Sequence, residues 1–224
     1  MEFRLPAFSA VIFDMDGLVL DSEPTYAFAW KKAAEAFGVE LEEGFLHGLF
    51  GRHADAVEAA LAQRIGAGFD RDRYHAAAAR FWRAHVVRHG IATLPGVENL
   101  LSMLDRKRVP YALATNSDGP FATECLRLAG LEGRFPWAVT RDQVAQGKPA
   151  PDLFQEAARR LGVSAAQCLV LEDSATGLLA ACRAGAIPVL VLDRPAPAES
   201  AALAAFSFRT LDELAGHLAS PPGF

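Results

Sequence analysis

The sequence predicts an α/β protein with a Rossmann-like parallel sheet core and an inserted helical cap subdomain. From about residue 91 onward, short apolar runs alternate with amphipathic segments, and one more apolar run lies near the N-terminus. Such alternation with short connections is typical of parallel strands joined by right-handed helical crossovers. Between the first run and the rest, only helical patterns occur. We therefore expect an α/β core made of residues 1–20 and 91–224, and an inserted α-helical cap at 21–90.

The first strand is predicted at Val11–Phe13, an apolar run without alternation, which is typical of a strand buried on both faces. Two carboxylates, Asp14 and Asp16, follow it, and then Gly17. The carboxyl ends of parallel strands form the ligand crevice of an α/β sheet, so both acids are expected there. In extended backbone, residues two apart project to the same side. On this stretch alone, a helix cap and a solvated acid remain an equally good interpretation.

The insertion is predicted to open with a helix near Pro24, with Ser22 or Glu23 as its cap. Further helices are expected at 54–65 and 72–89. An insertion after the first strand would lie over the carboxyl edge of the sheet, which is the position of a lid. The first helix shows one buried stripe with i, i+3, i+4, i+7 spacing, made of Trp30, Ala33, Ala34 and Phe37.

Five of the six histidines fall in the insertion, but their spacings do not match the His-Glu-x-x-His zinc motif. We interpret them as surface or helix-packing residues. After the insertion, the predicted strands are 111–115, 138–140, 168–171 and 187–192, and the predicted helices are 97–104, 121–129, 152–161, 176–184 and a last one opened by the capping box at 210–213.

Polar residues follow two more of the predicted strands. Thr115-Asn116-Ser117 follows one of them, and Glu172-Asp173-Ser174 follows another. Between them, Lys148 stands among glycine and prolines at a predicted helix start, where the helix N-terminus favours an anion. Each piece alone has a simple structural explanation, as a helix cap or a solvated lysine. Their joint occurrence at strand ends and a helix start favours a functional site.

This set of residues predicts a magnesium site beside an anion site. Asp14, Asp173 and Glu172 supply the oxygen ligands that magnesium prefers. Thr115 and Lys148 can hold the oxygens of a phosphate by hydrogen bond and charge. A carboxylate that attacks a phosphoryl group needs such neutralisation, because the two anions repel each other at contact distance.

The chain resembles the haloacid dehalogenase-like (HAD) hydrolases of the branch with a small helical cap. Its four motifs are Phe13–Gly17, Ala114–Ser117, Gly147–Pro149 and Leu171–Ser174, and Asp21–Pro24 marks the entry to the cap. The resemblance implies that Asp14 attacks phosphorus and that Asp16 exchanges protons with the leaving group and water. It also implies that the backbone carbonyl of Asp16 joins Asp14 and Asp173 on Mg²⁺, and that Thr115, Asn116 and Lys148 bind the phosphoryl group.

Within the family, a phosphatase is the favoured function, and a phosphoglucomutase-like transfer on a sugar phosphate is the alternative. Asp16 argues against a dehalogenase, since displacing halide needs no proton whereas an alcohol leaving phosphorus does. A mutase-like sequence carries histidine where this chain has Tyr26, and Phe50 and Ala54 lack the basic character that would hold a second phosphate. Arg52 and His53 could contact an anionic substrate or could equally be a solvated pair.

Two other classes remain open, a phosphoacceptor signalling module and a catalytically silent binding protein. The first would not need a large cap, and the second would usually have lost a site residue. The expected partner is a small phosphorylated metabolite whose identity the sequence does not give.

The composition narrows the remaining possibilities. A net charge of -5 and the lack of a basic run argue against nucleic-acid binding. No apolar run approaches the ~18 residues of a membrane helix, and the N-terminus does not resemble a signal peptide. Cys125, Cys168 and Cys182 have no metal-type spacing and are expected as reduced core residues. We therefore expect a cytoplasmic protein that binds no membrane, and a monomer, because no apolar stripe is left over.

Overall fold

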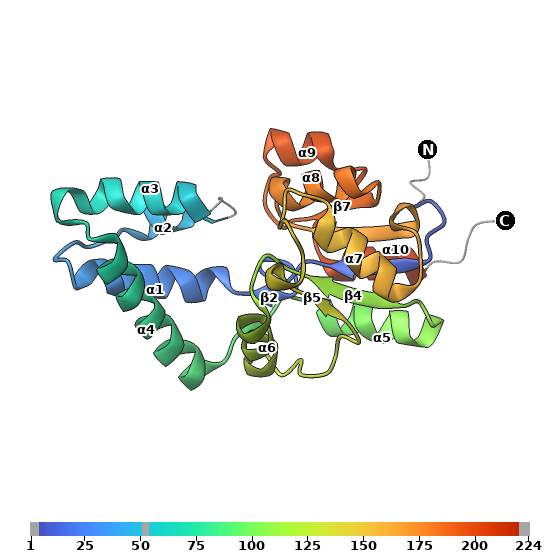
Figure 1. Cartoon of the computed structure of the whole chain (residues 1–224), viewed down its shortest axis with the longest axis horizontal. Coiled ribbons are helices and arrows are strands. Elements are labelled where there is room, and N and C mark those ends of the chain that lie inside the picture. Colours follow the sequence, from blue (N-terminus) through green and yellow to red (C-terminus); the bar gives the residue numbers. More distant parts are fainter. Residues whose placement is uncertain (1–4, 51–53, 220–224) are drawn as a thin grey trace. The chain divides into compact units, whose positions relative to one another are not determined.

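The computed structural model describes residues 5–50 and 54–219, and the chain divides into two compact units. One unit comprises Met1–Leu20 and Thr93–Phe224, and the other comprises Asp21–Ala92. Figure 1 shows the sheet in the first unit and helices α1 to α4 in the second. The predicted contacts Arg52 and His53, and the tail at 220–224, lie outside the described residues.

Within the described residues, six strands form a parallel sheet in the order β5-β4-β1-β6-β7-β8, which confirms the predicted fold class. The central strand β1 therefore lies between β4 and β6. The bounds are Ala10–Phe13 for β1, Tyr111–Ala114 for β4, Ala138–Val139 for β5, Cys168–Glu172 for β6, Ile187–Val191 for β7 and Phe206–Phe208 for β8.

The central strands β1, β4 and β6 are buried on both faces, as their unalternated sequences predict. Ala10 and Ile12 of β1 join a cluster with residues of α7 (Asp152–Leu161) and α8 (Ala175–Ala184). The ring of Phe13 instead packs edge-on against Tyr111 and Phe135, with centroids 6.2 and 5.7 Å away. Burying each large apolar side chain contributes about 1.5–3 kcal/mol, so β1 is a rigid support for the residues that follow it.

The helices of this unit cover both sides of the sheet. In Figure 1, α7 and α8 lie on one face and α5 (Val97–Lys107) on the other. Helix α10 (Leu211–Ala219) packs against α5, and one half of the predicted capping box is present, because Glu213 N donates to Thr210 Oγ1 at 3.1 Å. The Glu213 carboxylate accepts from Arg209 N at 2.6 Å, one residue before the cap position. Helix α6 (Gly119–Leu128) begins two residues before its predicted start, since Asp118 caps it by accepting from Phe121 N.

Two elements of this unit were not predicted, α9 (Ala198–Leu203) and β8. Both are short, and neither is long enough to repeat an apolar period. Cys125 and Cys168 are buried free thiols, as expected, but the expectation of a core position for Cys182 is wrong, because that residue is exposed. Two short 3₁₀ turns complete the unit, at Arg141–Gln143 and Ala165–Gln167.

The second unit is helical, with α1 (Glu23–Glu35), α2 (Glu43–His47), α3 (Ala54–Ile65), a 3₁₀ turn at Gly66–Gly68 and α4 (Arg71–His89). Tyr74 fixes α4 to α1 because its hydroxyl donates to Trp30 O at 2.9 Å. Ser22 occupies the cap position of α1, but its side chain makes no capping hydrogen bond, so this predicted cap is wrong in its chemistry. Helix α2 was not predicted.

The chain passes between the units through the short strands β2 (Leu20–Asp21) and β3 (Ala92–Thr93), which pair with each other. The predicted cap ended at residue 90, whereas the second unit runs to Ala92. Among the described residues, no helix combines the length and the apolar character needed to cross a membrane.

Candidate active site

The predicted site residues gather at one edge of the sheet. Asp14 directly follows β1, Thr115 directly follows β4, and Glu172 is the last residue of β6. Phe13 pairs with Leu113 on one side and with Leu171 on the other, so the three strand ends are level. The backbone continues this pairing, because Asp14 N donates to Leu171 O at 3.0 Å.

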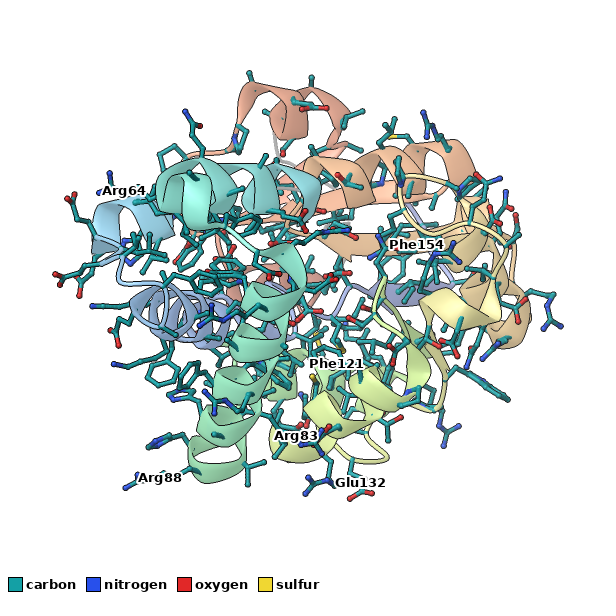
Figure 2. The ribbon with its side chains drawn as sticks, turned by 60° about the vertical axis from the view of Figure 1, so that its left-hand side comes forward. Arg64, Arg83, Arg88, Phe121, Glu132 and Phe154 are labelled. Carbon is teal, nitrogen blue, oxygen red and sulfur yellow. The ribbon has the colours of Figure 1, made fainter. Side chains whose placement is uncertain are left out.

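Lys148 joins the ends of β1 and β6. Its Nζ donates to Asp14 Oδ1 and, at 2.6 Å, to Glu172 Oε1. The same Nζ lies 4.9 Å from the ring centroid of Phe154, which α7 contributes and Figure 2 labels. Only 4% of the Lys148 side chain is exposed, so the simple interpretation of this lysine as a solvated surface residue is wrong.

The electrostatics of this trio favour a charged lysine. Burial lowers the pKa of Lys148, but the neighbouring carboxylates of Asp14 and Glu172 outweigh it and hold that pKa above its ordinary value. Glu172 is fully buried, and this burial raises its pKa to about 7, with Asp14 adding to the rise and Lys148 opposing it. A further cation beside these acids would favour the ionised form of Glu172.

Asp14, Glu172 and Asp173 form a group of potential metal ligands in the described part of the chain. Each offers one carboxylate oxygen, and these oxygens all lie within 4.8 Å of one another. Gly17 (φ 81°) leaves room for Asp173, because a β-carbon at residue 17 would overlap the Asp173 carboxylate. An all-oxygen donor set with several negative charges fits a small, hard divalent cation such as Mg²⁺.

Glu172 shares its two oxygens between different partners. Oε1 accepts from Lys148, and Oε2 accepts from Ser174 Oγ at 2.9 Å. Ser174 also caps α8, because its hydroxyl accepts from Gly177 N at 3.1 Å. The carboxylate lies so close to Gly177 that a β-carbon there would overlap it. A cation bound here would therefore compete with Lys148 for both Asp14 and Glu172.

Asp16 lies in the turn after β1, and its carboxylate is not one of the three in the metal-ligand group. The turn is closed by Gly17 N, which donates to Leu20 O at 2.9 Å. Ser117 Oγ donates to Asp16 Oδ2 at 3.3 Å, so the segment after β4 holds this acid. The sequence placed Ser117 within a motif but gave it no role. A hydroxyl residue two positions after Thr115, directly beyond a buried strand, is the signal that could have assigned one.

Thr115 and Asn116 meet different partners although they are adjacent. Thr115 is buried, and its Oγ1 accepts from Ser117 N at 3.0 Å, which leaves its own O–H as a donor for an anion. The Asn116 side chain is exposed but faces the backbone of Lys148, at 2.8 Å to the N–H and 3.2 Å to the carbonyl. Thr115 thus lies at the end of the strand next to β1, and Asn116 contacts the loop that carries Lys148.

The arrangement suits transfer of a phosphoryl group. It combines a buried carboxylate, a buried ammonium that neutralises it, a hydroxyl donor and a second acid held by its own hydrogen bond. A nucleophile and an acid that have separate environments can perform different steps of one reaction.

Comparisons with known proteins point in the same direction. A family model described as "haloacid dehalogenase-like hydrolase" matches residues 8–185. Fructose-1-phosphate phosphatase YqaB of Escherichia coli (strain K12) is 33% identical over 180 residues, which cover 80% of this chain and 93% of that protein. Phosphorylated carbohydrates phosphatase of Thermotoga maritima is 33% identical over 180 residues, with 79% and 81% covered.

A solved structure shows the same fold. The HAD family hydrolase from Deinococcus radiodurans R1, crystallised with bound phosphate and sodium, superposes with a TM-score of 0.76 at 31% identity. The alignment covers 96% of this chain and 99% of that one.

Proposed function

Because the chain belongs to the haloacid dehalogenase-like hydrolases, we propose that it is a Mg²⁺-dependent phosphatase that hydrolyses a small phosphate monoester through an aspartyl-phosphate on Asp14. The observation that carries the proposal is the buried lysine between Asp14 and Glu172 at the edge of the parallel sheet. Its charge offsets the repulsion between a carboxylate nucleophile and an anionic phosphoryl group.

In the first step, Asp14 attacks phosphorus, and the bond from phosphorus to the leaving oxygen breaks. Asp16 gives its proton to that oxygen, and the substrate departs as an alcohol. In the second step, Asp16 takes a proton from water as the water attacks the aspartyl-phosphate, which releases inorganic phosphate and restores Asp14. Ser117 holds the Asp16 carboxyl during both transfers.

Lys148 and Thr115 bind the oxygens of the phosphoryl group. Lys148 supplies a full charge, and the Thr115 hydroxyl supplies a neutral hydrogen bond from a buried position. Asp14, Asp173 and Glu172, together with the backbone carbonyl of Asp16, would hold Mg²⁺, and this ion would supply further positive charge at the phosphoryl oxygens.

The named relatives support a sugar phosphate or polyol phosphate as the substrate class. One acts on fructose 1-phosphate and another on phosphorylated carbohydrates, according to their names. The mutase alternative is disfavoured by Tyr26, because its ring stacks between Trp30 and Trp82, with centroids 6.0 and 6.1 Å away. This aromatic side chain cannot supply the proton chemistry of an imidazole at that position.

The test is release of inorganic phosphate from p-nitrophenyl phosphate and from a panel of sugar phosphates, at fixed Mg²⁺. Wild type should turn over and Asp14→Asn should not, since an amide is a poor nucleophile. Asp70→Asn is the matched control, because Asp70 is exposed and caps α4, a role that asparagine fills equally well. Equal rates for wild type and Asp14→Asn would exclude Asp14 as the nucleophile.

Analysis of the products and of the protein after the same incubations separates the remaining alternatives. A mutase would convert a hexose 1-phosphate to its isomer faster than it releases phosphate. A signalling module would become phosphorylated without turnover, and a silent binding protein would bind phosphate without either reaction.

A further inference from the structure

We infer that Asn116 is a positioning residue that fixes Lys148 through its backbone, instead of a ligand of the phosphate. The inference rests on the proposed function, because it assigns how the lysine of that site is held. It also replaces the expectation from the family resemblance that the Asn116 side chain contacts the phosphoryl group.

The Asn116 amide pairs with both backbone polar groups of one residue. Its Oδ1 accepts from Lys148 N at 2.8 Å, and its Nδ2 donates to Lys148 O at 3.2 Å. The opposite orientation of the amide would place oxygen against oxygen and NH₂ against N–H, so the pairing fixes the orientation. These two contacts satisfy the N–H and the carbonyl of Lys148, as the backbone of a neighbouring strand would in a β-sheet.

The residue before the lysine, Gly147, allows these contacts because it has no side chain. A β-carbon at Gly147 would overlap Asn116 Oδ1 and would lie 2.6 Å from Arg141 Cδ. Only glycine therefore allows the Asn116 amide to approach the loop this closely. On the other side of the lysine, Arg183 Nη1 donates to Pro149 O at 2.9 Å. The backbone of Lys148 is thus held from both directions.

The direction of the side chains after β4 agrees with this role. The chain bends at Asn116 and Ser117, directly after Thr115. Ser117 reaches Asp16, and the hydroxyl of Thr115 is bonded to Ser117 N. Asn116 instead projects to the Lys148 loop, so the three residues serve different parts of the site.

Holding the backbone matters because the ammonium must lie between two carboxylates. A lysine has a long flexible stem, and its charge is placed accurately only if the stem begins at a fixed point. A displacement of about 1 Å in a reacting group can cost on the order of 100-fold in rate. Asn116 itself is exposed, so its loss removes little buried structure.

The test is a double-mutant cycle measured with p-nitrophenyl phosphate at saturating Mg²⁺. Asn116→Ala should lower kcat by about 10- to 100-fold, with KM changed by less than about threefold, since the lysine stays present but misplaced. In a Lys148→Met background, Asn116→Ala should have no further effect, because the group it positions is gone. If the two losses multiply, Asn116 acts on the phosphate directly and the inference is wrong.

The control is Asn99→Ala, which removes a hydrogen bond of the same kind to Asp212 on the exposed side of α5. It should leave kcat unchanged. Equal unfolding temperatures for Asn116→Ala and Asn99→Ala would show that the loss of kcat does not come from unfolding.

A second readout is independent of activity. The Lys148 amide hydrogen should exchange with solvent at least about tenfold faster in Asn116→Ala, whereas the Leu113 amide, bonded to Trp137 O, should not change. Asn116→Asp keeps the acceptor for Lys148 N but sets its second oxygen against Lys148 O, so it should restore only part of the protection. If wild type lacks phosphatase activity, the proposed function fails while exchange still tests the positioning. If the Lys148 amide is equally protected in wild type and Asn116→Ala, the inference fails.

Discussion

Replacing Gly177 by alanine should destabilise the protein, although the same change usually stabilises a helix. At an ordinary helical position, Gly→Ala gains about 1 kcal/mol. At Gly177 the new β-carbon would overlap the Glu172 carboxylate, and overpacking of this kind costs about 1–3 kcal/mol. Full separation of the buried pair of Glu172 and Lys148 would cost a further ~3–5 kcal/mol. Because alanine at this position would separate the pair only partly, we expect the free energy of unfolding to fall by about 2–4 kcal/mol in total.

Gly216→Ala provides the matched comparison. Gly216 lies in α10, and a β-carbon there would meet no atom within 4 Å. This variant should be more stable by up to about 1 kcal/mol. For a domain of this size, 1 kcal/mol shifts Tm by about 2–4 °C, so Gly177→Ala should lower Tm by at least ~4 °C and Gly216→Ala should raise it by a few degrees.

Thermal unfolding followed by circular dichroism measures both variants under one condition. The sign of the change in Tm relative to wild type is decisive, because helix propensity alone predicts a higher Tm for both variants. If Gly177→Ala unfolds at or above the wild-type temperature, the close contact between Glu172 and α8 does not exist as described. The placement of the buried carboxylate would then have to be abandoned.

Three further predictions concern acid catalysis, the metal and pH. Ser117→Ala should lower kcat by about tenfold for an alkyl phosphate such as glycerol phosphate. In single-turnover formation of the aspartyl-phosphate, it should slow p-nitrophenyl phosphate much less, because that leaving group needs no proton from Asp16; equal effects on both substrates in this step would contradict the role of Ser117. Mg²⁺ at about 100 times its Kd should stabilise wild type by roughly 3 kcal/mol, and this gain should vanish in Asp173→Asn and with EDTA. Burial and the nearby His89 lower the pKa of His85 in the folded protein. As pH falls below about 6.5, His85 of the unfolded chain therefore binds a proton before His85 of the folded chain does, and the folded state loses stability. Tm should therefore fall less between pH 7 and 5 in His85→Asn than in wild type. If Tm falls equally with pH in both proteins, His85 does not contribute to the pH dependence of stability.

Much of the fold could be predicted because its signals are local. The buried strands are short apolar runs that end at polar residues, and α7 was predicted with the bounds it has, Asp152–Leu161, from one clear stripe. The misses have physical reasons. β8 is only three residues long and pairs on one side only, and α2 is too short to show a helical period. Phe37 continues the stripe of α1 in sequence but lies in the turn after it.

The membership of the site was also predictable, but the contacts within it were not. Asp14, Thr115 and Asp173 follow apolar runs, and parallel strands bring such positions to one edge. Nothing local says that Glu172 gives one oxygen to Lys148 and the other to Ser174, or that Asn116 faces a backbone 32 residues away. These partners depend on how the Lys148 loop crosses the strand ends, which is a property of the tertiary structure.

The described residues that would perform the chemistry all belong to one unit of the chain. Asp14, Asp16, Thr115, Lys148 and Asp173 lie within Met1–Leu20 and Thr93–Phe224. With Glu172 ionised, the acids at the metal group and Lys148 carry a net charge of about −2, which a single divalent cation balances. With that cation bound, this unit would hold the proposed phosphoryl site with its charges balanced. In the helical unit, Thr25 and Trp82 bond to each other, and the rings of Tyr26 and Trp30 stack. Substitutions of these residues should therefore leave the Mg²⁺ dependence of kcat unchanged, because the groups that would meet the phosphate all lie in the other unit.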